Sequence, residues 1–137
     1  MYITERSRGH VTVLDLVGPL VGGIGTESLR DKVNSLVLQH RMHVIVNLGK
    51  VAHIDSGGLG EMASALLATR RAGGNIKLLN LTKRNHELLS ITRLATQFDT
   101  FDDEADAVGS FAAPVVLENA LLRSEAVRLN QLARSSA

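Results

Sequence analysis

The chain has 137 residues, of which 45% are hydrophobic and 21% charged, proportions typical of one globular domain with its own core. Its formal net charge of +1 gives no basic footprint for nucleic acid, and aromatic residues, at 3%, are too few for base stacking. The absence of cysteine excludes disulfides and favours a cytoplasmic location. No charged-then-apolar leader or long apolar run is seen, so neither a signal peptide nor membrane insertion is expected.

The first part of the chain predicts a strand pair followed by a helix. Residues 11–17 are nearly all apolar or β-branched, which is typical of a buried strand, and residues 2–7 are its expected antiparallel partner. Gly18-Pro19 ends the second strand, because proline cannot donate to a central ladder. After a glycine-rich loop, Thr26 is the expected N-cap of a helix. The apolar face of this helix is predicted at Leu29, Val33, Leu36 and His40.

The remainder alternates strands with helices. The predicted elements are a strand at 43–48, a helix from Ser56 to Gly73-Gly74, a strand at 75–79, a helix at 83–94, a short strand at 97–101 and a helix to 111. The residues predicted to face inward are Leu59, Ala63, Leu66 and Leu67 in the first of these helices, and Leu88, Leu89 and Ile91 in the second. This order predicts an α/β domain over residues 1–112, with a mixed, mostly parallel sheet of four to five strands.

Residues 113–137 are expected to form a C-terminal extension. After a break at 112–114, leucines recur at roughly helical spacing, which predicts an amphipathic helix of about 15 residues. A helix of this length is marginal in water on its own. It could pack on its own domain, contact a second copy or a partner, or fray, so a monomer and a weak homodimer both remain open.

The most informative segment is residues 54–60, Ile-Asp-Ser-Gly-Gly-Leu-Gly, where a turn carrying an acid, a hydroxyl and glycines leads from a strand into a helix. Ser56 is predicted at or near the N-cap, with its hydroxyl beside unpaired backbone N–H groups. These groups and the helix macrodipole favour negative charge. The segment therefore suits a serine that is phosphorylated and dephosphorylated, or a site that holds a phosphate.

Other kinds of site fit this sequence less well. A hydrolase nucleophile elbow needs glycine where Ile54 stands. The glycines at 57–60 match neither a P-loop nor a dinucleotide fingerprint, which leaves at most a weak anion site. His40 and His43 have no acidic partner at ligand spacing, so we expect no metal, no cofactor and no catalytic residues.

The hexamer Asp55-Ser56-Gly57-Gly58-Leu59-Gly60 resembles the Asp-Ser-Ser/Thr-Gly-Leu-Gly signature of bacterial anti-sigma factor antagonists, members of the STAS-domain family. Residues 13–20 and 44–48 resemble two strands of that family, and residues 73–80 resemble the segment that follows the signature helix. The resemblance covers about residues 3–111 and leaves the extension unmatched.

This resemblance implies a small sheet with helices mainly on one face and a non-enzymatic role in signal transduction. The unmodified protein would bind an anti-sigma factor, often a GHKL-type serine kinase, and so free a sigma factor for transcription. The kinase would phosphorylate Ser56 and thereby expel the antagonist, and a PP2C-type phosphatase would restore it. The partner-binding residues implied are Asp55, Ser56, Gly57, Gly58, Leu59, Val21, Gly22 and Gly23.

Two departures from the family pattern stand out. Val21 occupies the place where many members carry an aspartate that contacts the partner. Gly57 replaces the second signature hydroxyl, which removes an alternative phosphoacceptor and is expected to loosen the turn. Two other functions stay open: a constitutive STAS scaffold or adaptor in a sensory assembly or transporter complex, and a nucleotide-responsive STAS module.

Overall fold

The computed structural model describes residues 1–22 and 28–111, and the expected extension at 113–137 lies outside the described residues. The elements, in chain order, are β1 (Tyr2–Arg8), β2 (Val11–Val17), α1 (Leu29–Leu38), β3 (His43–Lys50), α2 (Ser56–Arg71), β4 (Asn75–Leu79), α3 (Lys83–Ile91), the 3₁₀ helix η1 (Leu94–Thr96), β5 (Thr100–Phe101) and α4 (Glu104–Gly109).

The five strands form one sheet in the order β1-β2-β3-β4-β5. The β1–β2 pair is the antiparallel hairpin that the sequence predicted, and the other pairs are parallel. This confirms the predicted mixed, mostly parallel α/β sheet. Because β2, β3 and β4 are parallel, their carboxyl ends meet at one edge, where the connections to α1, α2 and α3 begin.

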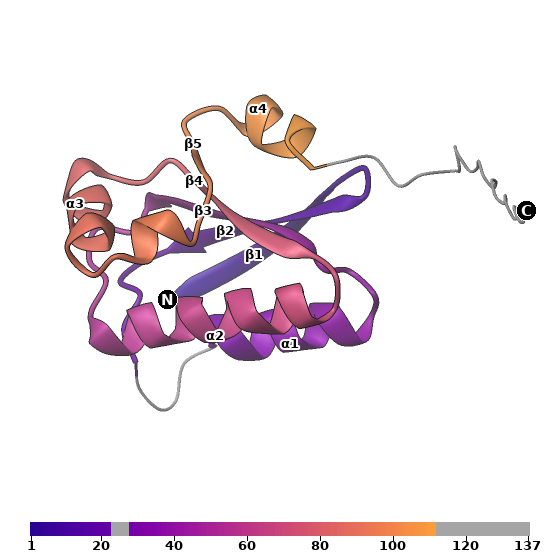
Figure 1. The fold of residues 1–137 in the computed structure, drawn as a ribbon, viewed down its shortest axis with the longest axis horizontal. Helices are drawn as coiled ribbons and strands as arrows, with labels where there is room; N and C mark the ends of the chain where they lie inside the picture. The colour runs from indigo at the N-terminus through magenta and orange to yellow at the C-terminus, as the bar shows by residue number, and fades with distance from the viewer. Residues whose placement is uncertain (23–27, 112–137) are drawn as a thin grey trace, which may run out of the picture.

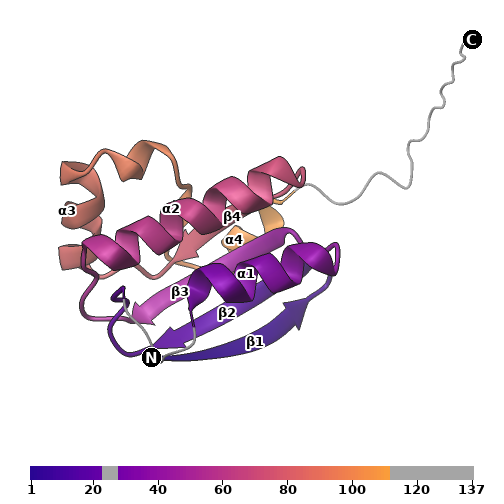
Figure 2. The ribbon, with the colours of Figure 1, turned by 90° about the horizontal axis from the view of Figure 1, so that it is seen from below.

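Helices α1 and α2 lie side by side on one face of the sheet, and α3 with η1 lies beside α2 (Figures 1 and 2). Alternate residues of the strands, such as Leu14 and Leu16 on β2 and Val44 and Val46 on β3, are buried in this main core. The helices contribute Leu36, Met62, Leu66 and Leu89 among others. The main core therefore lies between the sheet and three helices, on one face, as expected.

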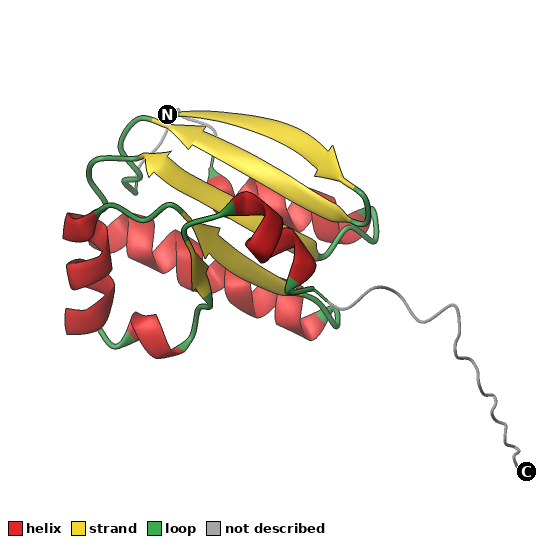
Figure 3. Ribbon diagram, turned by 90° about the horizontal axis from the view of Figure 1, so that it is seen from above, coloured by secondary structure: helices red, strands yellow, loops and turns green. Residues whose placement is uncertain are grey.

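The short helix α4 crosses the opposite face of the sheet (Figure 3). Ala107 of α4, and Phe111 just after this helix, pack on a second, smaller cluster formed by Val11, Val13 and Ile45, together with Leu79. The residues of β2 and β3 that point away from the main core are thus also buried. This explains why the sequences of both strands are nearly continuous apolar runs. A six-residue helix has little stability of its own, so its place depends on these contacts.

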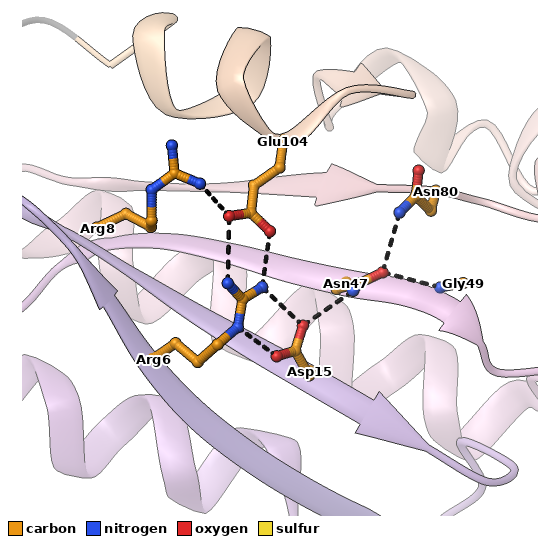
Figure 4. A network of polar contacts seen from close by, with 7 residues as sticks. All are labelled: Arg6, Arg8, Asp15, Asn47, Gly49, Asn80 and Glu104. Atoms are coloured by element: carbon orange, nitrogen blue, oxygen red, sulfur yellow. Dashed lines mark hydrogen bonds and ion pairs between the residues drawn. The ribbon is translucent and has the colours of Figure 1, made fainter.

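Polar contacts also hold α4 on the sheet (Figure 4). The Arg6 guanidinium bridges Asp15 on β2, with Nε to Oδ2 at 2.5 Å, and Glu104 on α4, with Nη2 to Oε1 at 2.7 Å. Arg8 forms a second ion pair with Glu104, and the Asn47 amide donates a hydrogen bond to Asp15 Oδ1 at 2.9 Å. The network joins three strands, β1, β2 and β3, to α4.

Several predicted details were wrong. Helix α1 is capped by Ser28 rather than Thr26, and its last helical residue is Leu38, so His40 lies beyond it with a φ of 60°. Leu67 and Ile91, predicted to face inward, are exposed. Residues 94–96 form a 3₁₀ turn instead of the end of a longer helix, which shortens the following strand to Thr100–Phe101.

Candidate functional site

The site begins where β3 leads into α2. Asp55 is the N-cap of α2, because its backbone is extended and its Oδ1 accepts the Gly58 N–H at 2.8 Å. Ser56 is therefore the first helical residue and not the cap. Its side chain is exposed, so the hydroxyl lies at the amino end of a 16-residue helix, within reach of another protein.

The connection after β2 runs alongside this helix start. Leu20 forms a parallel bridge with Ile54. The Leu20 N–H donates to the His53 carbonyl at 2.9 Å, and the Asp55 N–H donates to the Leu20 carbonyl at 3.2 Å. The Gly22 N–H then donates to Asp55 Oδ1 at 3.1 Å. One carboxylate oxygen thus holds both the first turn of α2 and the loop that precedes α1.

Two glycines of the signature make this close approach possible. A Cβ on Gly58 would lie 2.1 Å from the Leu20 carbonyl oxygen, and a Cβ on Gly57 would lie 2.6 Å from the Gly22 Cα. Real side chains do not fit at such distances. Gly57 was expected to loosen the turn, but in the structure it lets the two backbones meet. A second hydroxyl residue at position 57 would collide with Gly22.

The site carries a fixed negative charge. The Gly58 N–H, followed by the Gly22 N–H, holds the pKa of the Asp55 carboxyl below its ordinary value. At neutral pH the N-cap is therefore an anion that is paired with backbone dipoles. A phosphate on Ser56 would add about −1.5 to −2 charges directly beside it.

The structure brings most of the predicted site residues together. Ser56, Gly57 and Gly22 are exposed, while Val21, Asp55 and Leu59 are partly exposed. Gly58 is buried against Leu20, so it shapes the turn rather than the surface. Gly23 lies outside the described residues.

A hollow that the sequence did not reveal adjoins this surface. It has a volume of about 320 Å³ and is lined by His53, Ile54, Arg84, Asn85, Glu87, Leu88 and Ile91. Asn85 is buried and donates to the Val51 carbonyl at 2.7 Å, which fixes α3 against the turn before Ser56. The residues that line the hollow include Ile91, which is 80% exposed. No sequence signal brings α3 next to residues 51–54, because that contact depends on tertiary packing.

The histidines weighed as metal ligands lie apart from Ser56. His43 packs edge-on against the rings of His10 and Phe111, at the opposite ends of the parallel strands. Among residues 1–22 and 28–111, no three His, Cys, Asp or Glu side chains are grouped to hold a metal ion. Over the same residues, no helix is long and apolar enough to cross a membrane.

Comparisons with solved structures show the same fold at low sequence identity. TM1081 of Thermotoga maritima superposes with a TM-score of 0.68 at 19% identity, covering 78% of this chain and 92% of that chain. An anti-sigma factor antagonist from Mycobacterium paratuberculosis has a TM-score of 0.67 at 16% identity, covering 80% and 92%. Phosphorylated SpoIIAA, a Bacillus cell fate determinant, has a TM-score of 0.62 at 19% identity, covering 79% and 97%.

A comparison with curated proteins found no match. The sequence pattern of the STAS domain, in contrast, matches residues 2–107, which include every described strand and most of α4. The α/β sheet, the order of its elements and the helix start at Ser56 agree with that match. The chain therefore belongs to the STAS-domain family.

Proposed function

We propose that this chain is an anti-sigma factor antagonist, a protein-binding regulator that phosphorylation of Ser56 switches off. The observation that carries the proposal is the exposed Ser56 hydroxyl at the amino end of α2. The exposed or partly exposed residues near it, Val21, Gly22 and Leu59, are the proposed partner surface. The partner is an anti-sigma factor that is also a serine kinase of the GHKL type, and a PP2C-type phosphatase removes the phosphate.

Two physical effects make Ser56 suitable for such a switch. The amino end of a helix accepts negative charge, so the phosphorylated domain should remain folded. A partner packed over the same residues must desolvate the dianion, and the neighbouring Asp55 carboxylate adds like charge. A loss of about 2–4 kcal/mol weakens binding roughly 30- to 1,000-fold, which is enough to expel the antagonist.

Val21 indicates how the partner surface differs from the common pattern. Where many relatives are expected to present an aspartate, this chain presents a partly exposed apolar side chain followed by exposed Gly22. The matching surface of the anti-sigma factor should therefore be apolar at this point. Asp55 has a structural role at this surface, because its Oδ1 accepts hydrogen bonds from two backbone N–H groups.

The test is binding of Ser56 variants to the anti-sigma factor kinases encoded by the same genome, measured by calorimetry. Ser56→Asp should weaken binding at least about 10-fold, and Ser56→Ala should bind like the unmodified protein and resist the kinase. Ser64→Asp is the matched control, because Ser64 is exposed two turns further along the same helix. Equal binding by Ser56→Ala and Ser56→Asp would contradict the switch and favour a constitutive adaptor.

A further inference from the structure

Strand β1 forms one edge of the sheet, and its outer side is open (Figure 2). The other edge strand, β5, has only two residues and offers few backbone groups to another chain, whereas β1 has seven. Within residues 1–22 and 28–111, the backbone of β1 pairs with β2 alone. A row of N–H and C=O groups therefore faces away from the domain along β1.

The features that commonly protect an edge strand from pairing are missing from β1. Its sequence, Tyr-Ile-Thr-Glu-Arg-Ser-Arg, has neither proline nor lysine. Its register with β2 is continuous from Tyr2 to Arg8, so no bulge turns the edge away. Its three charged side chains all form ion pairs within the domain: Glu5 with Lys32 and Arg41, Arg6 with Asp15 and Glu104, and Arg8 with Glu104. These paired charges repel an approaching strand only weakly.

An exposed apolar pair lies beside this edge. Tyr2 is 78% exposed, and Val17, its cross-strand partner on β2, is 42% exposed. By the alternation of the strands, both side chains lie on the face of the sheet that carries α4. A second chain along β1 would remove part of the Tyr2 ring from water and lower the free energy.

We propose that two copies of this chain pair antiparallel through β1, which joins two five-stranded sheets into one continuous sheet. The two-fold axis that relates such edge strands is perpendicular to the sheet. One residue of β1 therefore lies opposite its own copy, and the α4 faces of both sheets lie on the same side. Each strand supplies the backbone donors and acceptors that the other requires.

Charge selects the register of this pairing and favours a second copy over an unrelated strand. With Thr4 opposite its own copy, Tyr2 lies opposite Arg6 of the second copy, where the ring can contact the guanidinium. Ile3 then lies opposite Glu5 of the second copy. A register centred on Glu5 or Arg6 would instead place like charges directly opposite each other. Thr4 is exposed and uncharged, so β1 is complementary to itself about this residue.

The dimer should be weak and should leave Ser56 accessible. Only one strand of each copy takes part, so the dissociation constant should lie at roughly 1–100 µM. Ser56 follows β3, which is separated from β1 by β2 in the sheet. The pairing therefore does not depend on the phosphorylation of Ser56.

The first test is sedimentation of the full chain at concentrations from roughly 1 µM to 1 mM. The dimer fraction should rise over this range. Thr4→Lys places two ammonium groups opposite each other in the dimer and should raise the dissociation constant at least about 10-fold. In the monomer the new ammonium faces Asp15, the cross-strand neighbour of Thr4, so the fold should persist. Thr100→Lys is the matched control, because Thr100 is an exposed threonine on the other edge strand.

A second test crosslinks the register directly, and it keeps the proposal testable if Thr4→Lys unfolds. The chain has no cysteine, so Thr4→Cys introduces a single thiol. Opposite Cα atoms in an antiparallel pair lie about 4.5–5.5 Å apart, within disulfide range, so this variant should form a covalent dimer under mild oxidation. Ser7→Cys is also on the exposed side of β1 but would lie about 20 Å from its copy and should stay monomeric.

The contrary outcomes are equally specific. A chain that stays monomeric up to about 1 mM would overturn the proposal, as would equal weakening by Thr4→Lys and Thr100→Lys. Crosslinking of Ser7→Cys as fast as that of Thr4→Cys, or no crosslinking of Thr4→Cys, would overturn it as well.

Discussion

Gly57 and Gly22 meet backbone to backbone, so closely that a Cβ on Gly57 would lie 2.6 Å from the Gly22 Cα. The contact joins the first turn of α2 to the loop before α1, at the position where the family signature ordinarily has a second hydroxyl residue. The glycine at position 57 and the glycine at position 22 are therefore complementary: each is small because the other is close.

Substitution of the signature glycines should destabilise the domain in proportion to this crowding. Gly58→Ala places a methyl group 2.1 Å from the Leu20 carbonyl oxygen, and Gly57→Ala presses on Gly22. Each should cost about 1–3 kcal/mol in the free energy of unfolding, measured by urea denaturation. Gly60→Ala is the control, because nothing lies within 4 Å of its Cβ position, and it should stabilise α2 by up to about 1 kcal/mol. Equal effects at positions 58 and 60 would contradict the close approach.

Asp55 should make the stability of the fold depend on pH in the acid range. The Gly58 and Gly22 N–H groups lower the pKa of its carboxyl below the ordinary 3.8, so the unfolded chain takes up the proton first. The stabilisation is fully present above about pH 4 and is lost as the pH falls through the lowered pKa of the folded state. Asp55→Asn should be less stable at neutral pH and should show a shallower decline in acid, measured by thermal unfolding from pH 7 to pH 2.5. An unchanged acid profile would contradict the double hydrogen bond.

His43 should make the stability of the fold depend on pH in a range above that of Asp55. Burial, followed by the charges of His10 and Lys77, lowers the pKa of His43 below 6.5, and its Nδ1 is buried without a hydrogen-bond partner in the described part of the chain. The folded state therefore favours neutral imidazole, and stability should fall as the pH drops below about 6.5. His43→Phe keeps a ring against Phe111 and should flatten the profile of unfolding between pH 7 and pH 5. A slope between pH 7 and pH 5 that His43→Phe leaves unchanged would contradict the burial of this imidazole.

The ion pairs of Arg6 should contribute modestly to the docking of α4. Its guanidinium joins Asp15 to Glu104, but its side chain is 39% exposed, so solvent screens these pairs. Arg6→Met should lower stability by no more than about 1 kcal/mol, with a smaller difference in 1 M salt. Arg30→Met is the control, because the Arg30 Nε lies 3.9 Å from the exposed Asp31 carboxylate, a long ion pair on the surface. A loss that salt does not reduce would mean that packing, rather than charge, holds α4.

The parts of the fold that the sequence predicts are those with strong local signals. The apolar strand at 11–17, the turn at 54–60 and the glycine that ends α2 at position 73, where φ is +87°, each carry their own physical reason. The errors arise where packing decides. Helical spacing alone placed Leu67 inward, but α2 buries Met62, Ala65 and Thr69 instead. Those residues occupy a different face of the same helix.

In the candidate site, too, features set by adjacent residues could be predicted from the sequence, and features set by tertiary contacts could not. Exposure of Ser56 at a helix start follows from residues 54–60, because the strand, turn and helix are adjacent in sequence. The hydrogen bond from the Gly22 N–H to Asp55 Oδ1 cannot be predicted in this way, because it joins residues 33 positions apart. The hollow beside α3 likewise depends on Asn85 reaching the Val51 carbonyl, a tertiary contact without a local pattern.

The measurement that tests the central claim most directly is mass spectrometry of the protein isolated from its own cells, with peptide mapping across Asp55–Gly60. We expect a species heavier by one phosphate, about 80 Da, at Ser56, whose fraction changes with growth or stress and which no longer binds the anti-sigma factor. A Ser56 that stays unmodified under every condition, or a phosphorylated form that still binds, would contradict it.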